Sequence, residues 1–113
     1  MIPSIYDFTI PQGTTVIRHF CLKDAHGLPV DLTGYAVRLT VRPRYGSKCA
    51  ADELSSEDTP ERMTVEAKAG RVKCLWPADM TAALALGRYS YALDLTSADG
   101  FSFRPISGQI TIS

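Results

Sequence analysis

Residues 89–95 place the tightest constraint on the fold of this chain, because their apolar side chains alternate without interruption. Tyr89, Tyr91, Leu93 and Leu95 fall on one face of an extended strand, and the residues between them fall on the other face. This pattern is typical of a strand with one face in a core. We therefore expect Tyr89 and Tyr91 to have structural roles in a β-sheet.

Short apolar segments separated by turn residues fill most of the remaining chain. Besides 89–95, strands are predicted at residues 5–10, 14–22, 28–32, 35–42, 63–68, 71–76 and 101–112. The strand at 14–22 is apolar on both faces, which predicts a central position in its sheet. One short helix is predicted at 77–84, with Pro77 at an early position. Residues 43–62 lack an apolar period and predict a long polar loop; such a loop is either functional or mobile, and we favour a mobile one.

Glycine and proline mark the connections between these strands. Gly34 is predicted to form a turn, and Ala69-Gly70 and Asp99-Gly100 are predicted to form tight hairpins. Pro105 cannot donate to a sheet ladder, so we expect it at an edge or a bulge.

Many short strands with a single helix favour a β-sandwich over an α/β fold. We predict one domain over residues 1–113: an all-β, immunoglobulin-like antiparallel sandwich of seven or eight strands with one short helical crossover. Tyr89, which follows Gly87 and Arg88, stands where such a fold has its tyrosine corner. Tyr91 occupies the place of the second cysteine of an antibody domain, and Trp76 falls outside the Cys-Trp-Cys order. The disulfide-bonded version is therefore excluded.

Charge and cysteine content narrow the function classes. Twelve basic and twelve acidic residues cancel, which removes the usual driving force for nucleic-acid or membrane-surface binding. The cysteines have no zinc-binding spacing and are odd in number. Cys21 and Cys74 are predicted to be small buried hydrophobes, and Cys49, in the polar loop, is expected to be the reactive thiol.

No constellation of residues indicates catalysis, a cofactor or a metal site. His19 and His26 have no attached nucleophile, and Asp24 beside His26 is typical of a turn. The acidic residues between 52 and 61 lack calcium-loop spacing and predict a solvated loop. We therefore expect a protein that is not an enzyme and has no small-molecule substrate.

Exposed aromatic rings would suit a carbohydrate-binding or adhesion module. Tyr6, Tyr45 and Trp76 are the candidates, although Trp76 ends a core-facing series and is expected to fill the sandwich. Open strand edges offer another route, because a second chain can continue them.

Three segments together resemble a known family: residues 6–13 (YDFTIPQG), 27–35 (GLPVDLTGY) and 87–93 (GRYSYAL), followed by 108–112 (GQITI). They are similar to small tailed-phage and prophage proteins related to the N-terminal domain of baseplate upper proteins, and the likeness leaves residues 43–62 uncovered. The resemblance implies an immunoglobulin-like structural domain without catalytic residues, acting in a tail, baseplate or neck through contacts with other phage structural proteins. We therefore expect a phage structural protein that works as a homo-oligomer, located in the virion and assembled in the host cytoplasm.

Overall fold

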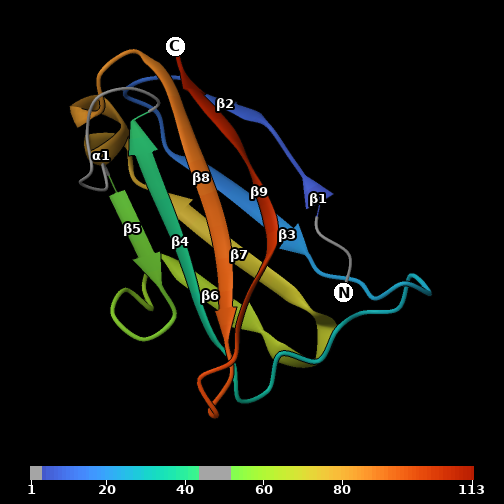
Figure 1. Cartoon of the computed structure of the whole chain (residues 1–113). Helices are drawn as coiled ribbons and strands as arrows, with labels where there is room; N and C mark the ends of the chain where they lie inside the picture. Colours follow the sequence, from blue (N-terminus) through green and yellow to red (C-terminus); the bar gives the residue numbers. More distant parts are fainter. Residues whose placement is uncertain (1–3, 44–51) are drawn as a thin grey trace.

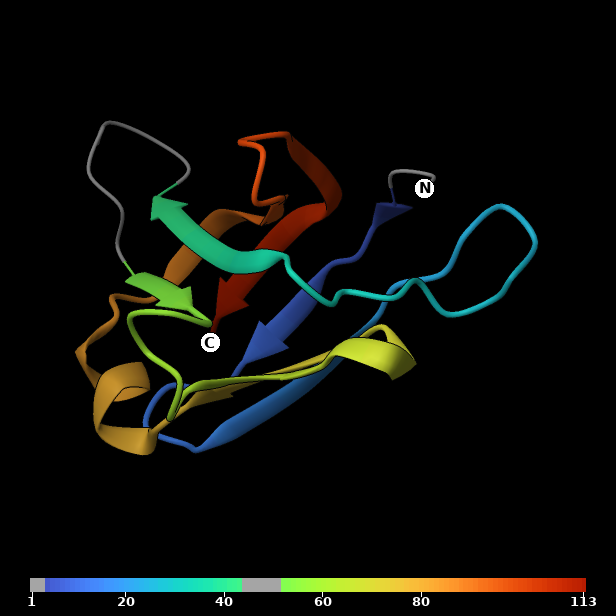
Figure 2. The same ribbon diagram turned by 90° about the horizontal axis from the view of Figure 1, so that it is seen from below.

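Two β-sheets face each other across one core (Figures 1 and 2) in the computed structural model, which describes residues 4–43 and 52–113. The strands in these residues are β1 (Ser4–Ile5), β2 (Phe8–Ile10), β3 (Val16–Cys21), β4 (Ala36–Pro43), β5 (Asp52–Ser55), β6 (Met63–Glu66), β7 (Arg71–Trp76), β8 (Gly87–Thr96) and β9 (Ser102–Ile112). A 3-10 turn, η1 (Ala67–Ala69), precedes β7, and the predicted short helix is present as α1 (Ala78–Ala83).

The strand order identifies the type of sandwich. One sheet has six strands in the order β1-β9-β8-β4-β5, with β2 also pairing with β9, and the other has three in the order β3-β7-β6. In an immunoglobulin domain, strands B, E and D share one sheet, and G, F, C and C′ share the other. Here β3, β7 and β6 occupy the first set of positions, and β9, β8, β4 and β5 occupy the second. The predicted all-β, immunoglobulin-like sandwich is confirmed.

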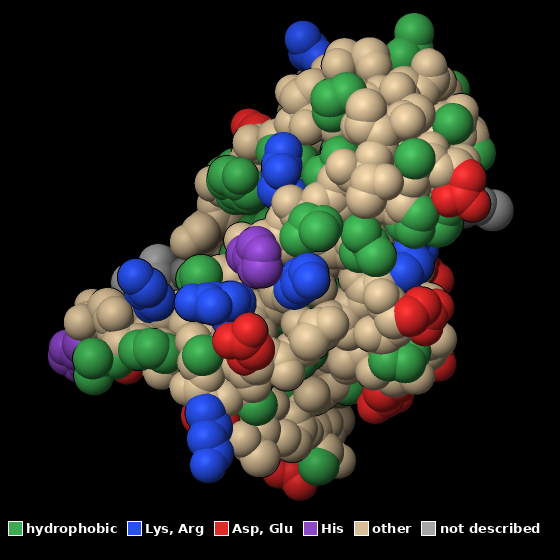
Figure 3. Space-filling model, turned by 180° about the vertical axis from the view of Figure 1, so that it is seen from behind, with side chains coloured by type: hydrophobic (Ala, Val, Ile, Leu, Met, Phe, Trp, Pro, Cys, Tyr) green, Lys and Arg blue, Asp and Glu red, His purple; other side chains and the backbone are tan. Residues whose placement is uncertain are grey.

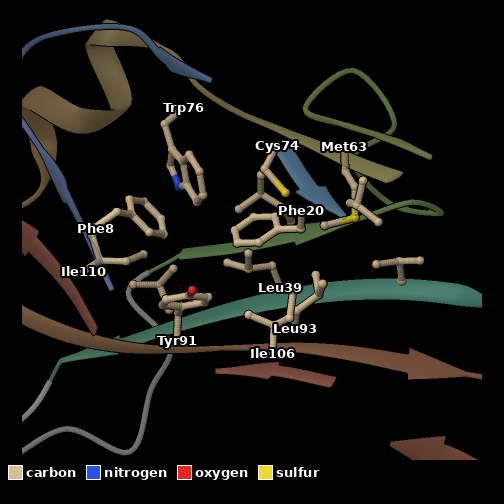
Figure 4. Packing of buried hydrophobic residues seen from close by; sticks show 14 of the residues in the cluster. Phe8, Phe20, Leu39, Met63, Cys74, Trp76, Tyr91, Leu93, Ile106 and Ile110 are labelled. Atoms are coloured by element: carbon tan, nitrogen blue, oxygen red, sulfur yellow. The ribbon is translucent and has the colours of Figure 1, made fainter. Parts of the chain in front are cut away.

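Large side chains from both sheets meet in the core (Figure 4). The ring of Phe20 on β3 lies 6.0 Å from that of Tyr91 on β8, and Phe8 lies 5.8 Å from Trp76 and 5.4 Å from Tyr91. Tyr89, Tyr91, Leu93 and Leu95 are all buried, which confirms the face predicted from their alternation.

Three strand predictions were wrong. Residues 52–55, inside the predicted loop, form β5 and pair with β4; residues 44–51 lie outside the described residues. The predicted strand at 28–32 contains only an isolated bridge between Lys23 and Pro29, because the segment crosses the end of the three-stranded sheet. There the backbone N–H of Val30 donates to the carbonyl oxygen of Leu22, and that of Leu32 donates to the carbonyl oxygen of Ala67. The two hydrogen bonds therefore go to different segments and do not form one strand ladder.

The third error concerns β3, which lies at an edge and not in the centre of its sheet. Its outer face carries Ile17, His19 and Cys21, all exposed. The apolar residues on this face therefore do not indicate that a second layer of protein packs against it. The prediction that Cys21 is buried was wrong for the same reason, whereas Cys74 on β7 is buried as predicted.

The first predicted strand is divided into β1 and β2, and both pair with β9 in parallel. The ladder breaks at Tyr6 and Asp7, where the Asp7 carboxylate accepts the backbone N–H of Gln109 at 2.8 Å. Gly108 permits this contact, since a Cβ atom there would lie 2.2 Å from the Tyr6 carbonyl oxygen. The sandwich is therefore antiparallel except along this edge.

The turns are wider than two residues. Glu66 pairs with Arg71, so four residues, including η1, replace the predicted Ala69-Gly70 hairpin. Thr96 pairs with Ser102, which leaves residues 97–101 as the loop containing Asp99-Gly100. Of the two positions predicted for Pro105, an edge or a bulge, the structure shows a bulge, where the β8–β9 register shifts.

Candidate interaction surface

The outer face of the six-stranded sheet has small side chains at its centre. Alternation turns Ser90 and Ala92 of β8 away from the core, and the register places Ser107 of β9 and Thr40 of β4 on either side of Ala92. Because these side chains are short, the surface of the sheet is recessed here relative to its surroundings. A partner could therefore approach its backbone closely.

Charged side chains border this low region. Arg104 on β9 donates to the Asp94 carboxylate on β8, with Nε 2.8 Å from Oδ1, and this hydrogen bond raises the pKa of Arg104. The bulge creates the pair, because Arg104 and Pro105 together lie opposite Asp94. On β4, Arg38 forms an exposed ion pair with Asp58 at 3.3 Å.

Two open hollows adjoin on this face, with volumes of about 950 Å³ and 540 Å³, and Asp94 and Arg104 line both. The first is also lined by residues of β4, of the segment after β5 and of the loop 97–101, and the second by residues of β1, β4, β8 and β9. Small-molecule sites are usually enclosed and mostly apolar. Shallow hollows with mixed lining suit a protein surface better.

Aromatic residues lie differently from the predicted sugar platform. Trp76 is 1% exposed, and its indole N–H donates to Asp52 at 3.1 Å, so the ring cannot stack on a sugar. Tyr6 is 45% exposed and stacks on Phe8, and Tyr45 lies outside the described residues.

Another aromatic pair, which the sequence analysis did not identify, borders the first hollow. Tyr35 and Phe103 meet with ring centroids 5.8 Å apart, and both are half-buried. Phe103 belongs to a predicted strand, but only the β8–β9 register places it near Tyr35.

The predicted structural residues are found as follows. The Tyr89 hydroxyl donates to the Ala85 carbonyl oxygen at 2.8 Å, which is the hydrogen bond of a tyrosine corner. The Tyr91 hydroxyl donates to the Tyr6 carbonyl oxygen, and Gly34 and Gly87 both have positive φ, at 85° and 140°. Each glycine therefore occupies a backbone conformation that other residues rarely adopt.

A buried ion pair that the sequence analysis missed joins the two sheets. Arg62, just before β6, donates from both terminal nitrogens to the Asp52 carboxylate of β5, at 3.1 and 2.7 Å. Their side chains are 9% and 8% exposed, and Trp76 completes the group. No local motif indicates this group, because its members are separated in sequence.

The residues considered for chemistry lie apart from the two hollows. His19 is on the outer face of β3, and the Asp24 carboxylate accepts the backbone N–H groups of His26 and Leu28, which forms the predicted turn. Among the described residues, no group of three or more His, Cys, Asp or Glu could hold a metal ion. Burial raises the pKa of the Cys74 thiol to about 12, and Cys49 lies outside the described residues.

Arg18 occupies the gap between the free edges of the two sheets. Its guanidinium lies 5.3 Å from the centre of the Phe8 ring and donates to the carbonyl oxygens of Ile17 on β3 and Thr9 on β2, at 3.1 and 3.5 Å. An added strand would need such carbonyl groups. Strand addition is therefore disfavoured at this edge.

Comparison with known proteins adds little. No protein-family model and no curated protein matches the chain. Among solved structures, it is similar to the extracellular domains 3–5 of Drosophila OTK, at 13% sequence identity and a TM-score of 0.34, over 96% of this chain and 31% of that one. The fold assignment therefore rests on the strand order described above. In the described part of the chain, no helix has the length and apolar character needed to cross a membrane.

Proposed function

We propose that this chain is a structural module of a phage or prophage particle, in a tail, baseplate or neck, that binds other structural proteins through the outer face of its six-stranded sheet. The single observation that carries the binding proposal is the hollow of small side chains around Ala92, which adjoins the first hollow at the Asp94–Arg104 pair. The phage assignment is supported by the resemblance of residues 6–13, 27–35 and 87–93 to the phage family.

The composition of this face suits a protein partner. Tyrosine and arginine are enriched among residues that dominate binding energy at protein interfaces. Tyr35, Arg38 and Arg104 line the hollows, with hydroxyl and backbone groups between them. Because the surface is open, a partner could cover both hollows at once and desolvate the Asp94–Arg104 pair.

Substitution of Ala92 by arginine tests this proposal. Ala92 is half-buried and lines the second hollow, so Ala92→Arg should raise the centre of the face and prevent close approach. Ala82→Arg is the control, since it makes the same change at an exposed position of α1 that lines neither hollow. Each variant is co-expressed with the structural proteins encoded by adjacent genes, and the complexes are measured by size exclusion with light scattering.

We expect the wild type and Ala82→Arg to co-elute with one of these proteins and Ala92→Arg to elute alone with an unchanged melting midpoint. Equal binding by Ala92→Arg would show that the partner uses another surface. If no structural protein binds and a glycan array gives a clear signal, the carbohydrate-binding alternative replaces this proposal.

A further inference from the structure

The outer face of the three-stranded sheet is basic. Alternation along β7 turns Arg71 and Lys73 away from the core, and the register places Lys73 between His19 of β3 and Thr64 of β6. Lys68 is exposed in η1, next to this face. Figure 3 shows the view from behind, in which Lys, Arg and His side chains gather on this side of the molecule.

The basic side chains of this face have little acid to neutralise them. Arg71 meets Glu66 at 3.6 Å, and both side chains are about half exposed. Lys73 has no ion pair among the described residues. Beside it, Ile17 is 43% exposed and pairs with Leu75, which adds an apolar strip to the same face.

The balancing acidic residues lie on a lateral border of the sandwich. Glu57, Asp58 and Glu61 are exposed in the segment between β5 and β6, and Glu53 is exposed on β5. Only Asp58 among these four has an ion pair in the described part of the chain, with Arg38. In Figure 3, several acidic side chains lie along the right border, and others lie elsewhere on this view.

We propose that the basic face of one copy docks against the acidic 57–61 segment of a second copy. This inference rests on the proposed function, because it identifies the contact by which such a module would assemble with itself. The chain is neutral as a whole, so the separated charges form two complementary surfaces. Because these surfaces differ, the contact is head-to-tail, and repetition produces a ring or a filament.

The dimensions of the molecule permit such a contact. A standard interface covers about 800 Å² on each partner, and the molecule measures 37 × 26 × 25 Å. The Ile17–Leu75 strip would supply apolar burial beside the charges. Electrostatic complementarity of this kind chiefly sets the orientation of the two copies and the rate at which they associate. Salt weakens this electrostatic attraction.

Reversing the charge on each surface tests the contact. Self-association of the full chain and of each variant is measured by sedimentation velocity at low and high salt. Lys73→Glu reverses charge on the basic face, and Glu61→Lys does so on the acidic segment without touching either hollow. Arg88→Glu is the matched control: it changes the net charge as Lys73→Glu does, at an exposed position on β8 outside both hollows. Thermal melting verifies that each variant is folded.

We expect the wild type and Arg88→Glu to associate with rising concentration, and less at high salt. Lys73→Glu and Glu61→Lys should each raise the dissociation constant by about tenfold or more, and an equimolar mixture of the two should restore association.

Three results would overturn the inference. In the first, the wild type is monomeric at every concentration and salt. In the second, the wild type associates but neither charge reversal weakens the association. In the third, the wild type binds heparin without self-associating, and Lys73→Glu loses the heparin binding. The last result would assign the basic face to an acidic polymer. Partner binding that is lost in Ala92→Arg and retained in Lys73→Glu would leave the proposed function intact in all three cases.

Discussion

The Tyr89 hydroxyl donates a 2.8 Å hydrogen bond to the carbonyl oxygen of Ala85, four residues earlier, and so ties the start of β8 to the segment that follows α1. Tyr89 is 8% exposed, so its hydroxyl lies where few water molecules can replace a lost partner. The crossover between the two sheets is therefore held by a side chain of the strand it leads into.

Removing this hydroxyl should weaken the fold. Tyr89→Phe keeps the ring but leaves the Ala85 carbonyl without its donor, and we expect a loss of about 1 kcal/mol in the free energy of unfolding. Urea denaturation of both proteins measures it. An unchanged midpoint would mean that the corner contributes no stability.

The Asp52–Arg62 pair should matter far more than the exposed ion pairs. Asp52→Ala leaves a buried guanidinium without its carboxylate and removes the acceptor of the Trp76 indole, and we expect a loss of about 3 kcal/mol or more. Asp58→Ala is the matched control, because its pair with Arg38 is exposed, and it should change stability by less than about 0.5 kcal/mol. Similar losses in both variants would contradict this ranking.

Gly108 should not tolerate a side chain. In Gly108→Ala, the new Cβ would lie 2.2 Å from the Tyr6 carbonyl oxygen, so the β1–β2 edge must move away from β9. We expect a loss of about 2 kcal/mol, in the range of overpacked cores. Hydrogen exchange should show weaker protection at Tyr6, whose N–H donates to the Ser107 carbonyl oxygen. Wild-type protection at Tyr6 would refute the prediction.

Stability should fall at alkaline pH because of Cys74. Burial raises the pKa of its thiol from 9.0 to about 12, so between these values the unfolded chain loses a proton that the folded chain keeps. This contribution is complete below pH 9 and declines as the pH rises toward 12. Burial also raises the pKa of Tyr91, which adds to the decline above pH 10.

Urea midpoints between pH 7 and 10.5 measure this decline, with Cys74→Ala as the comparison. The variant is less stable overall but should lose stability less steeply above pH 9. Equal slopes would show that the Cys74 thiol is not the group responsible.

The local sequence pattern was sufficient to predict which side chains are buried where a strand has one face in the core. The alternation in 89–95 predicted the side that enters the core, and Tyr89, Tyr91, Leu93 and Leu95 are buried. Pro105 was expected at an edge or a bulge and lies at a bulge, since its missing N–H is a property of the residue itself.

Pattern failed where the environment of a residue depends on distant segments. Ile17 resembles a core residue, yet nothing in the described part of the chain forms a second layer over the outer face of β3, and the strand lies at an edge. The candidate surface could be predicted only in part: alternation turns Ser90 and Ala92 outward, but the neighbours that shape its hollows come from β4 and β9.

The sequence by itself determined an all-β sandwich, its principal core strands, the short helix and the tyrosine corner, since these depend on residue type and on spacing within a few positions. Only the tertiary structure decided that Asp52 is a buried partner of Arg62 and that basic and acidic side chains gather on separate surfaces. Such relationships join residues far apart in the chain. They are set by which strands pair and in what register, and the alternation within a single strand does not specify that.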